Sequence, residues 1–124
     1  MTISSQSKSL NFDGTDDAVT IGTIHGVDDI VRFTNQFTLE TWIYSTSQDA
    51  DGQFRLLIGD PSVGGNGAVR PPSLYTYNRN KIHAGYGSGS SWNNIFPGPA
   101  FTTNKWNHIA YTYDGTNMVI YING

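Results

Sequence analysis

A chain of 124 residues is long enough for one domain and too short for two, and 37% hydrophobic residues are sufficient for a folded core. The net charge is −3, and the seven Lys and Arg form no basic cluster, which argues against nucleic acid and anionic membranes as partners. The chain has no cysteine, which excludes disulfides and thiol chemistry, and no apolar run approaches the roughly 18 residues that cross a membrane. The N-terminal stretch MTISSQSKSLNF lacks the apolar segment of a signal peptide.

The first predicted elements are two short strands, over residues 8–12 and 18–22, on either side of an acidic turn. The turn FDGTDD places Asp13, Asp16 and Asp17 within five residues. Hard oxygen ligands from a single loop suit Ca²⁺, and a cation would relieve the repulsion among three carboxylates. The alternative is a solvated turn in which Asp13 bonds to its own backbone.

A short helical turn is expected around residues 27–31, and strands are predicted over 37–45 and 54–59. The 37–45 strand, like a later strand over 106–113, carries apolar side chains on both of its faces, so both are predicted to be central strands. The segment DPSVGGNGAVRPP, residues 60–72, is rich in Gly and Pro and is predicted to be a loop.

The next region, residues 74–99, contains the candidate ligand-binding residues. Strands are predicted over 74–78 and 81–86, followed by a loop over 85–99, GYGSGSSWNNIFPGP. Loops of this kind carry ligand contacts more often than the framework does, although both predicted loops could instead be connections without a binding role. The candidates are Tyr75, Tyr77, Tyr86, Trp92 and Asn93.

The last predicted strands, over 106–113 and 118–123, are joined by the turn dipeptide Asp114-Gly115. Tyr111 and Tyr113 are expected in the core rather than at a ligand, because sandwiches commonly bury aromatic residues. The second strand ends in Asn123-Gly124, a strong signal for a hairpin turn that leads into a returning strand.

Short strands separated by frequent turn signals predict an all-β sandwich or barrel.

The sequence lacks the known catalytic motifs that we compared with it. A glycosidase needs two carboxylates across the bond that it cleaves, but Glu40 is the only glutamate, and Thr38 and Trp42 beside it on its strand face are not acidic. The three histidines lack the spacing of a zinc site, and no G-x-S-x-G motif is present. We therefore expect a protein that is not an enzyme.

Three stretches, SLNFDGTDDAVTIG, FTLETWIY and WNHIAYTYDGTNMVIYING, resemble the laminin G-like, concanavalin A-like domain family in their order and motifs. The resemblance implies an antiparallel jelly-roll β-sandwich. It also implies a binding module for glycans or proteins, secreted, at a cell surface or on a virion, within a larger protein. Family members often hold a structural calcium near the Asp-Gly-x-x-Asp turn, which would assign Ca²⁺ binding to Asp13 and Asp16.

The family continues beyond its Asn-Gly turn with further strands, which are not part of this sequence. Residues 1–124 are therefore interpreted as the N-terminal portion of a single laminin G-like domain, either a truncated chain or one half of a split domain. The alternative is a complete minimal sandwich whose final Asn-Gly is only a frayed tail. A second polypeptide or a symmetry-related copy is expected to supply the C-terminal strands. Glycan recognition is the function expected first. The alternative is a structural or adhesion module that contacts protein and binds no sugar.

Overall fold

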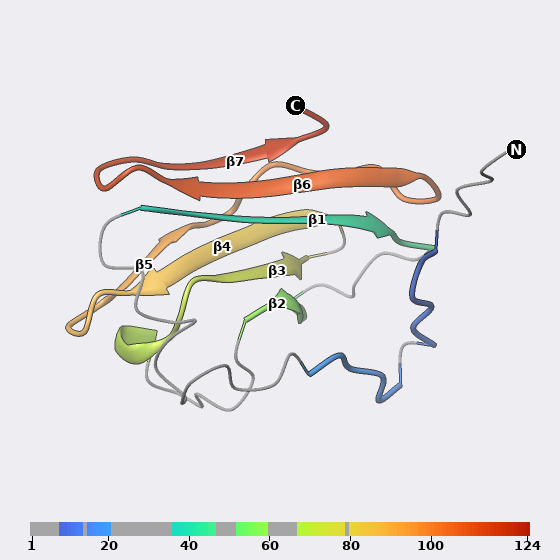
Figure 1. Cartoon of the computed structure of the whole chain (residues 1–124), viewed down its shortest axis with the longest axis horizontal. Helices are drawn as coiled ribbons and strands as arrows, with labels where there is room; N and C mark the ends of the chain where they lie inside the picture. Colours follow the sequence, from blue (N-terminus) through green and yellow to red (C-terminus); the bar gives the residue numbers. More distant parts are fainter. Residues whose placement is uncertain (1–7, 14, 21–35, 47–51, 60–66, 79) are drawn as a thin grey trace, which may run out of the picture.

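The computed structural model describes residues 8–13, 15–20, 36–46, 52–59, 67–78 and 80–124. These residues form two antiparallel sheets that lie face to face (Figure 1). The predicted all-β, antiparallel sandwich is thereby confirmed. Within the described ranges the only helix is a single 3₁₀ turn, η1 (Gly67–Val69), and no helix there is long and apolar enough to cross a membrane.

One sheet has three strands in the order β1-β6-β7, namely β1 (Phe37–Tyr44), β6 (Trp106–Tyr113) and β7 (Met118–Ile122). The predicted strands over 37–45, 106–113 and 118–123 are confirmed to within one residue. Among the described residues, the prediction that both long strands are central holds for β6, which pairs on both sides, whereas β1 pairs with β6 alone. The outer side chains Trp42 and Tyr44 of β1 are also exposed.

The other sheet has four strands in sequence order, β2 (Phe54–Ile58), β3 (Ser73–Tyr77), β4 (Lys81–Gly87) and β5 (Trp92–Ile95). Strand β5 lies inside the segment predicted to be a loop, so that prediction was wrong. The Gly/Ser run forms a tight hairpin instead: the Ser88 backbone N–H donates to the Ser91 carbonyl over 2.9 Å, and Gly87 then faces Trp92 in the ladder.

The two strands predicted at the N-terminus are not found: residues 8–12 and 18–20 are irregular, and 21–22 lie outside the described residues. The described part of this segment runs apart from both sheets, as Figure 1 shows, so it lacks the neighbouring strand that a β-ladder requires. The helical turn predicted around 27–31 also lies outside the described residues.

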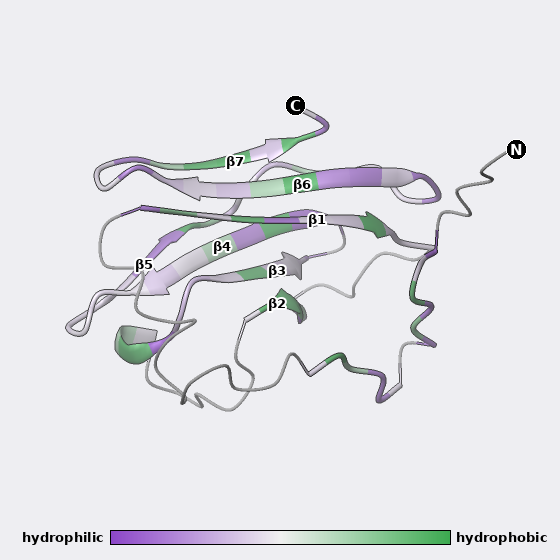
Figure 2. Ribbon diagram, viewed as in Figure 1, coloured by the Kyte–Doolittle hydropathy of each residue, from purple (hydrophilic) through white to green (hydrophobic). Residues whose placement is uncertain are grey.

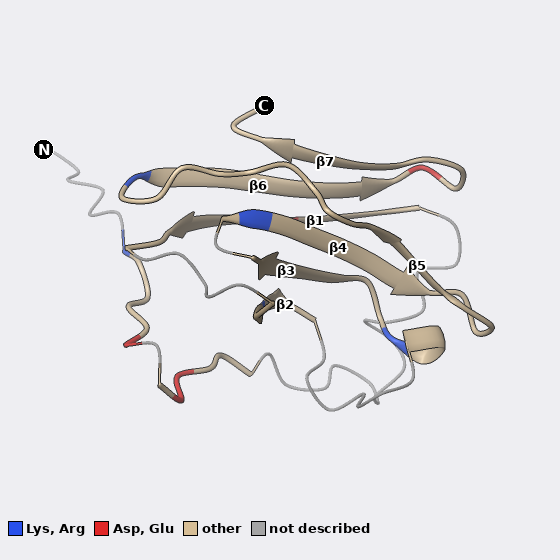
Figure 3. Cartoon of the chain, turned by 180° about the vertical axis from the view of Figure 1, so that it is seen from behind, with Lys and Arg blue, Asp and Glu red and all other residues tan. Residues whose placement is uncertain are grey.

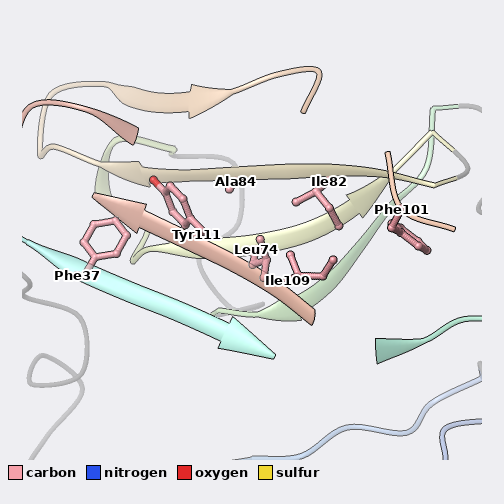
Figure 4. Close-up of a cluster of buried hydrophobic side chains, with 7 residues drawn as sticks. All are labelled: Phe37, Leu74, Ile82, Ala84, Phe101, Ile109 and Tyr111. Atoms are coloured by element: carbon pink, nitrogen blue, oxygen red, sulfur yellow. The ribbon is translucent and has the colours of Figure 1, made fainter. Parts of the chain in front are cut away.

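The hydrophobic core lies between the two sheets and contains residues from both (Figure 4). Figure 2 shows hydrophilic and hydrophobic bands alternating along the first part of β4, the pattern that gives this strand an inner and an outer face. Tyr111 is fully buried as predicted, its hydroxyl donates to Met118 Sδ over 3.2 Å, and burial raises its pKa. The buried cluster consists of Phe37, Leu74, Ile82, Ala84, Phe101, Ile109 and Tyr111.

A polar residue, Asn107, is fully buried at the start of β6. Its Nδ2 donates to the Thr102 carbonyl over 2.8 Å and to the Lys105 carbonyl over 3.0 Å. Its Oδ1 accepts from Asn123 Nδ2 over 3.3 Å. Asn123, with φ of 58°, also accepts the His108 backbone N–H, so the first residue of the predicted Asn-Gly turn is fixed against β6.

Candidate ligand-binding face

Aromatic side chains gather on the outer face of the four-stranded sheet. Leu74 on β3 points into the core, so alternation places its neighbours Tyr75 and Tyr77 on the outer side. The register sets His83 of β4 opposite Tyr75 and Phe54 of β2 opposite Tyr77, and residues directly opposite in a ladder share a face. We call this surface the aromatic face; it comprises Phe54, Tyr75, Tyr77, His83, Trp92 and Phe96.

His83 is the centre of the aromatic face. Its ring centroid lies 5.2 Å from that of Phe54, 5.7 Å from that of Tyr75 and 5.1 Å from that of Phe96. The Trp92 ring lies 6.1 Å away and almost parallel to it, at 15°. Burial lowers the pKa of His83 from its ordinary value of 6.5, and Nδ1 is buried without a hydrogen-bond partner. The imidazole is therefore neutral at pH 7 and packs as an aromatic ring.

A hollow of about 390 Å³ opens on the aromatic face, within the size range of small-ligand pockets. Missing side chains help to form it. A Cβ on Gly85 would lie 2.5 Å from Trp92 Cζ2, and a Cβ on Gly67 would lie 2.8 Å from Trp92 Cβ. The indole therefore occupies space that only glycine leaves open. The lining residues are Phe54, Gly67, Arg70, Tyr75, His83 and Trp92.

Polar groups border the hollow on one side. Arg70 follows η1, is half-buried, and donates from Nη1 to the Tyr75 hydroxyl over 2.9 Å. The Arg70 carbonyl accepts the Gly87 N–H over 2.8 Å, which ties the arginine backbone to the end of β4. A few fixed polar groups beside apolar and aromatic walls are typical of sites that bind small molecules.

The structure brings three of the five predicted ligand-binding residues to this face. Trp92 and Tyr75 line the hollow, and Tyr77 lies beside it with its ring 4.3 Å from that of Phe54. Tyr75 is only 9% exposed, so it forms the floor rather than an open stacking surface.

Tyr86 and Asn93 are directly opposite each other in the β4–β5 ladder and share the inner face of the sheet. Tyr86 packs against the core, with its ring 5.9 Å from that of Phe37 and 4.9 Å from that of Tyr113. The structure therefore does not bring Tyr86 and Asn93 into the hollow. Phe54, Arg70 and His83 were not among the predicted site residues, although the alternation in KIHAGYG places His83, Gly85 and Gly87 on one face.

The acidic turn lies on the N-terminal segment. Carboxylate oxygens of Asp13, Asp16 and Asp17 come within 4.8 Å of one another, and all three residues are exposed. Asp17 accepts the Asp13 N–H and Asp13 accepts the Thr15 N–H, both over 2.8 Å. These bonds use one oxygen of each of the two carboxylates. The remaining oxygens suit a hard cation such as Ca²⁺, whose six to eight ligands would also include water or backbone carbonyls.

The chain is thus an antiparallel two-sheet sandwich with an aromatic hollow on the outer face of one sheet. Comparison with protein families agrees: a laminin G model described as the concanavalin A-like lectin/glucanases superfamily matches residues 13–124. The chain belongs to this family, which is generally non-catalytic and often binds calcium. None of the curated proteins and none of the solved structures compared with the chain matches it.

Proposed function

We propose that the protein is a non-catalytic glycan-binding module and that the aromatic face is its binding site. The observation that carries this proposal is the partly buried Trp92 indole that lines a hollow of about 390 Å³. The C–H face of a sugar ring is apolar and fits against an aromatic ring, while hydroxyl groups need polar partners. Tyr75 Oη and the Arg70 guanidinium provide such partners in the hollow, and Asn94 adds an exposed amide beside it on β5.

A binding role without catalysis is supported by the position of Glu40. This residue lies on β1, in the other sheet, where its carboxylate is 3.4 Å from His108 Nε2. The described residues that line the hollow include no carboxylate. A pair of carboxyl groups flanking a glycosidic bond is therefore not part of the site that we propose.

Trp92→Ala should weaken binding to the best ligand of a broad glycan array by about 1–3 kcal/mol, the usual cost of removing an aromatic anchor. Trp42→Ala is the matched control, because Trp42 lies on the three-stranded sheet and is 63% exposed. That variant should bind as the natural protein does. Affinities from titration calorimetry, with melting curves of both variants, test the prediction. Equal losses in the two variants, or no binding anywhere on the array, would contradict it.

We further propose that the acidic turn binds calcium and that Asp13 and Asp16 are ligands, together with Asp17. A cation that binds only the folded state stabilises it by mass action, so excess Ca²⁺ should raise the melting temperature relative to excess chelator. Asp13→Asn should abolish this rise. Glu40→Gln removes an equal charge far along the sequence and should retain it. Melting curves that do not respond to calcium would leave the solvated turn as the correct interpretation.

A protein-binding or adhesion role is the second candidate, and two observations favour it. The outer face of the three-stranded sheet exposes Trp42, Tyr44, Trp106 and Tyr121, and aromatic residues are enriched at protein interfaces. In the same sheet, β1 and β7 each pair with β6 alone among the described residues, and open edges accept strands from other chains. The glycan array separates the two candidates, since an adhesion module of this kind would bind none of the sugars.

A further inference from the structure

The charges of this acidic protein are distributed unevenly along the sequence. Residues 61–113 contain four of the seven Lys and Arg and none of the ten Asp and Glu. This segment includes η1, β3, β4, β5 and β6, and therefore most of the four-stranded sheet. Figure 3 shows basic residues and no acidic residue on the described parts of that sheet and its connections. Among the described residues of this sheet and its connections, 52–59, 67–78 and 80–95, Arg55, Arg70 and Lys81 are basic and none is acidic, whereas the whole chain has a net charge of −3.

Arg70 concentrates this charge at the hollow. Both backbone polar groups of Arg70 are hydrogen-bonded: its N–H donates to the Gly67 carbonyl over 3.2 Å, and its carbonyl accepts the Gly87 N–H. Its guanidinium is held by the Tyr75 hydroxyl. No carboxylate in the described part of the chain pairs with it. A guanidinium has five N–H donors in a plane, so most of them remain for a ligand.

The remaining walls define what kind of anion fits. Phe54, Trp92 and the neutral His83 are aromatic, so the hollow suits a ring with an apolar face rather than a small inorganic anion. Because the Tyr75 hydroxyl accepts from Arg70, its own hydrogen is free to donate to the same anionic group. A planar guanidinium binds carboxylate and sulfate through two parallel hydrogen bonds.

We infer that the hollow selects acidic saccharides, with a ring-borne carboxylate or sulfate on Arg70 and the sugar ring against Trp92. This inference rests on the proposed glycan-binding function and specifies its ligand class. The shared chemistry is an anionic group on a pyranose ring, and uronic acids and sulfated sugars are its two sources.

Two matched ligand pairs test the inference and separate these sources. The first pair is a galacturonic acid oligosaccharide and its methyl ester, and the second is a sulfated and an unsulfated galactose oligosaccharide of equal length. The natural protein should bind at least one acidic member about tenfold or more tightly than its neutral partner, as expected for a charge-assisted hydrogen bond. Preference within the first pair identifies the carboxylate as the group that is bound, and preference within the second identifies the sulfate.

Arg70→Gln should remove the preference by weakening the acidic ligand about tenfold while leaving the neutral one nearly unchanged. Arg70→Lys keeps the charge but loses the planar fork, so it should retain only part of the preference. Lys105→Gln is the control for net charge, because Lys105 is exposed and immediately precedes β6. The beginning of β6 lies at the opposite end of the sandwich from the 3₁₀ turn η1 (Figure 3). Lys105→Gln should bind as the natural protein does.

The outcomes distinguish this inference from the function on which it rests. If acidic and neutral ligands bind equally and Arg70→Gln changes neither, the acidic preference is wrong while glycan binding stands. If Lys105→Gln weakens acidic ligands as much as Arg70→Gln does, net charge rather than the Arg70 site causes the preference, and the inference is again wrong. If no saccharide binds although the protein is folded, the glycan-binding proposal is wrong, and the inference that rests on it is wrong as well.

Discussion

An Asn107→Asp variant should lose about 3–5 kcal/mol of its free energy of unfolding at pH 7, the usual cost of leaving a buried charge unpaired. Asn107 is 0% exposed, and its Nδ2 donates to two backbone carbonyls. Aspartate has the same shape, but its carboxylate cannot donate and would face the carbonyl oxygens of Thr102 and Lys105. The turn before β6 and the contact with Asn123 should both be weakened.

The loss should become smaller at lower pH, because a protonated aspartic acid can again donate to a carbonyl. Burial raises the folded-state pKa of the new carboxyl above its unfolded value near 3.9. The destabilisation is therefore complete above the folded pKa and decreases as the pH falls toward the unfolded one. His83, which is present in both the variant and the natural protein, acts in the opposite direction. Its lowered pKa makes the folded state less stable as the pH falls below about 6.5.

Urea unfolding of variant and natural protein at pH 7 and at pH 5 measures this prediction, and taking their difference at each pH cancels the contribution of His83. Asn94→Asp is the control, since Asn94 is exposed on β5, and it should change the free energy of unfolding by no more than about 0.5 kcal/mol. A loss from Asn107→Asp that is equally small, or independent of pH, would show that the buried network does not hold the turn.

Ile109→Ala should lower the free energy of unfolding by about 2–5 kcal/mol, the range observed when a large aliphatic side chain is removed from a core. Ile109 is fully buried at the middle of β6, the central strand of its sheet, and its side chain belongs to the cluster between the sheets. Its loss leaves a cavity that neighbours on both sheets line. Val119→Ala, on the outer face of β7, is the control and should cost much less.

The midpoint of urea unfolding should fall for Ile109→Ala without a change in slope, because the area exposed on unfolding is nearly the same. If Ile109→Ala and Val119→Ala cost equal amounts, the two sheets do not share one core.

The framework of the sandwich could be predicted where strand alternation and turn residues agree. The 106–113 strand is confirmed residue for residue, because WNHIAYTY is rich in aromatic and β-branched residues and is followed by Asp114, whose Oδ1 accepts the N–H groups of Thr116 and Asn117. These hydrogen bonds lower the pKa of Asp114, with Asn117 contributing most. Strand β5 was missed because WNNI has few β-forming residues and follows a Gly/Ser run that is typical of loops.

The binding face could be predicted only in part, because a face depends on strand register. The spacing of Tyr75 and Tyr77 within one predicted strand is sufficient to place both on one face. Assigning Tyr86 to the inner face and Trp92 to the outer one requires knowing that the hairpin pairs Gly87 with Trp92. Arg70 lies outside every strand, and its approach to Tyr75 depends on η1, for which the sequence gives no pattern.

Strand residues form most of the hollow, glycines leave room for Trp92, and Arg70 is hydrogen-bonded to Tyr75 of β3 and Gly87 of β4. The shape of the hollow is therefore set when the sheet folds. A ligand would meet an aromatic surface already in place, with its tryptophan and arginine held by neighbouring groups. Little side-chain freedom remains to be lost on binding, and this loss is a main cost of association. Variants of the described wall residues should therefore change how long a bound sugar remains more than how fast it arrives.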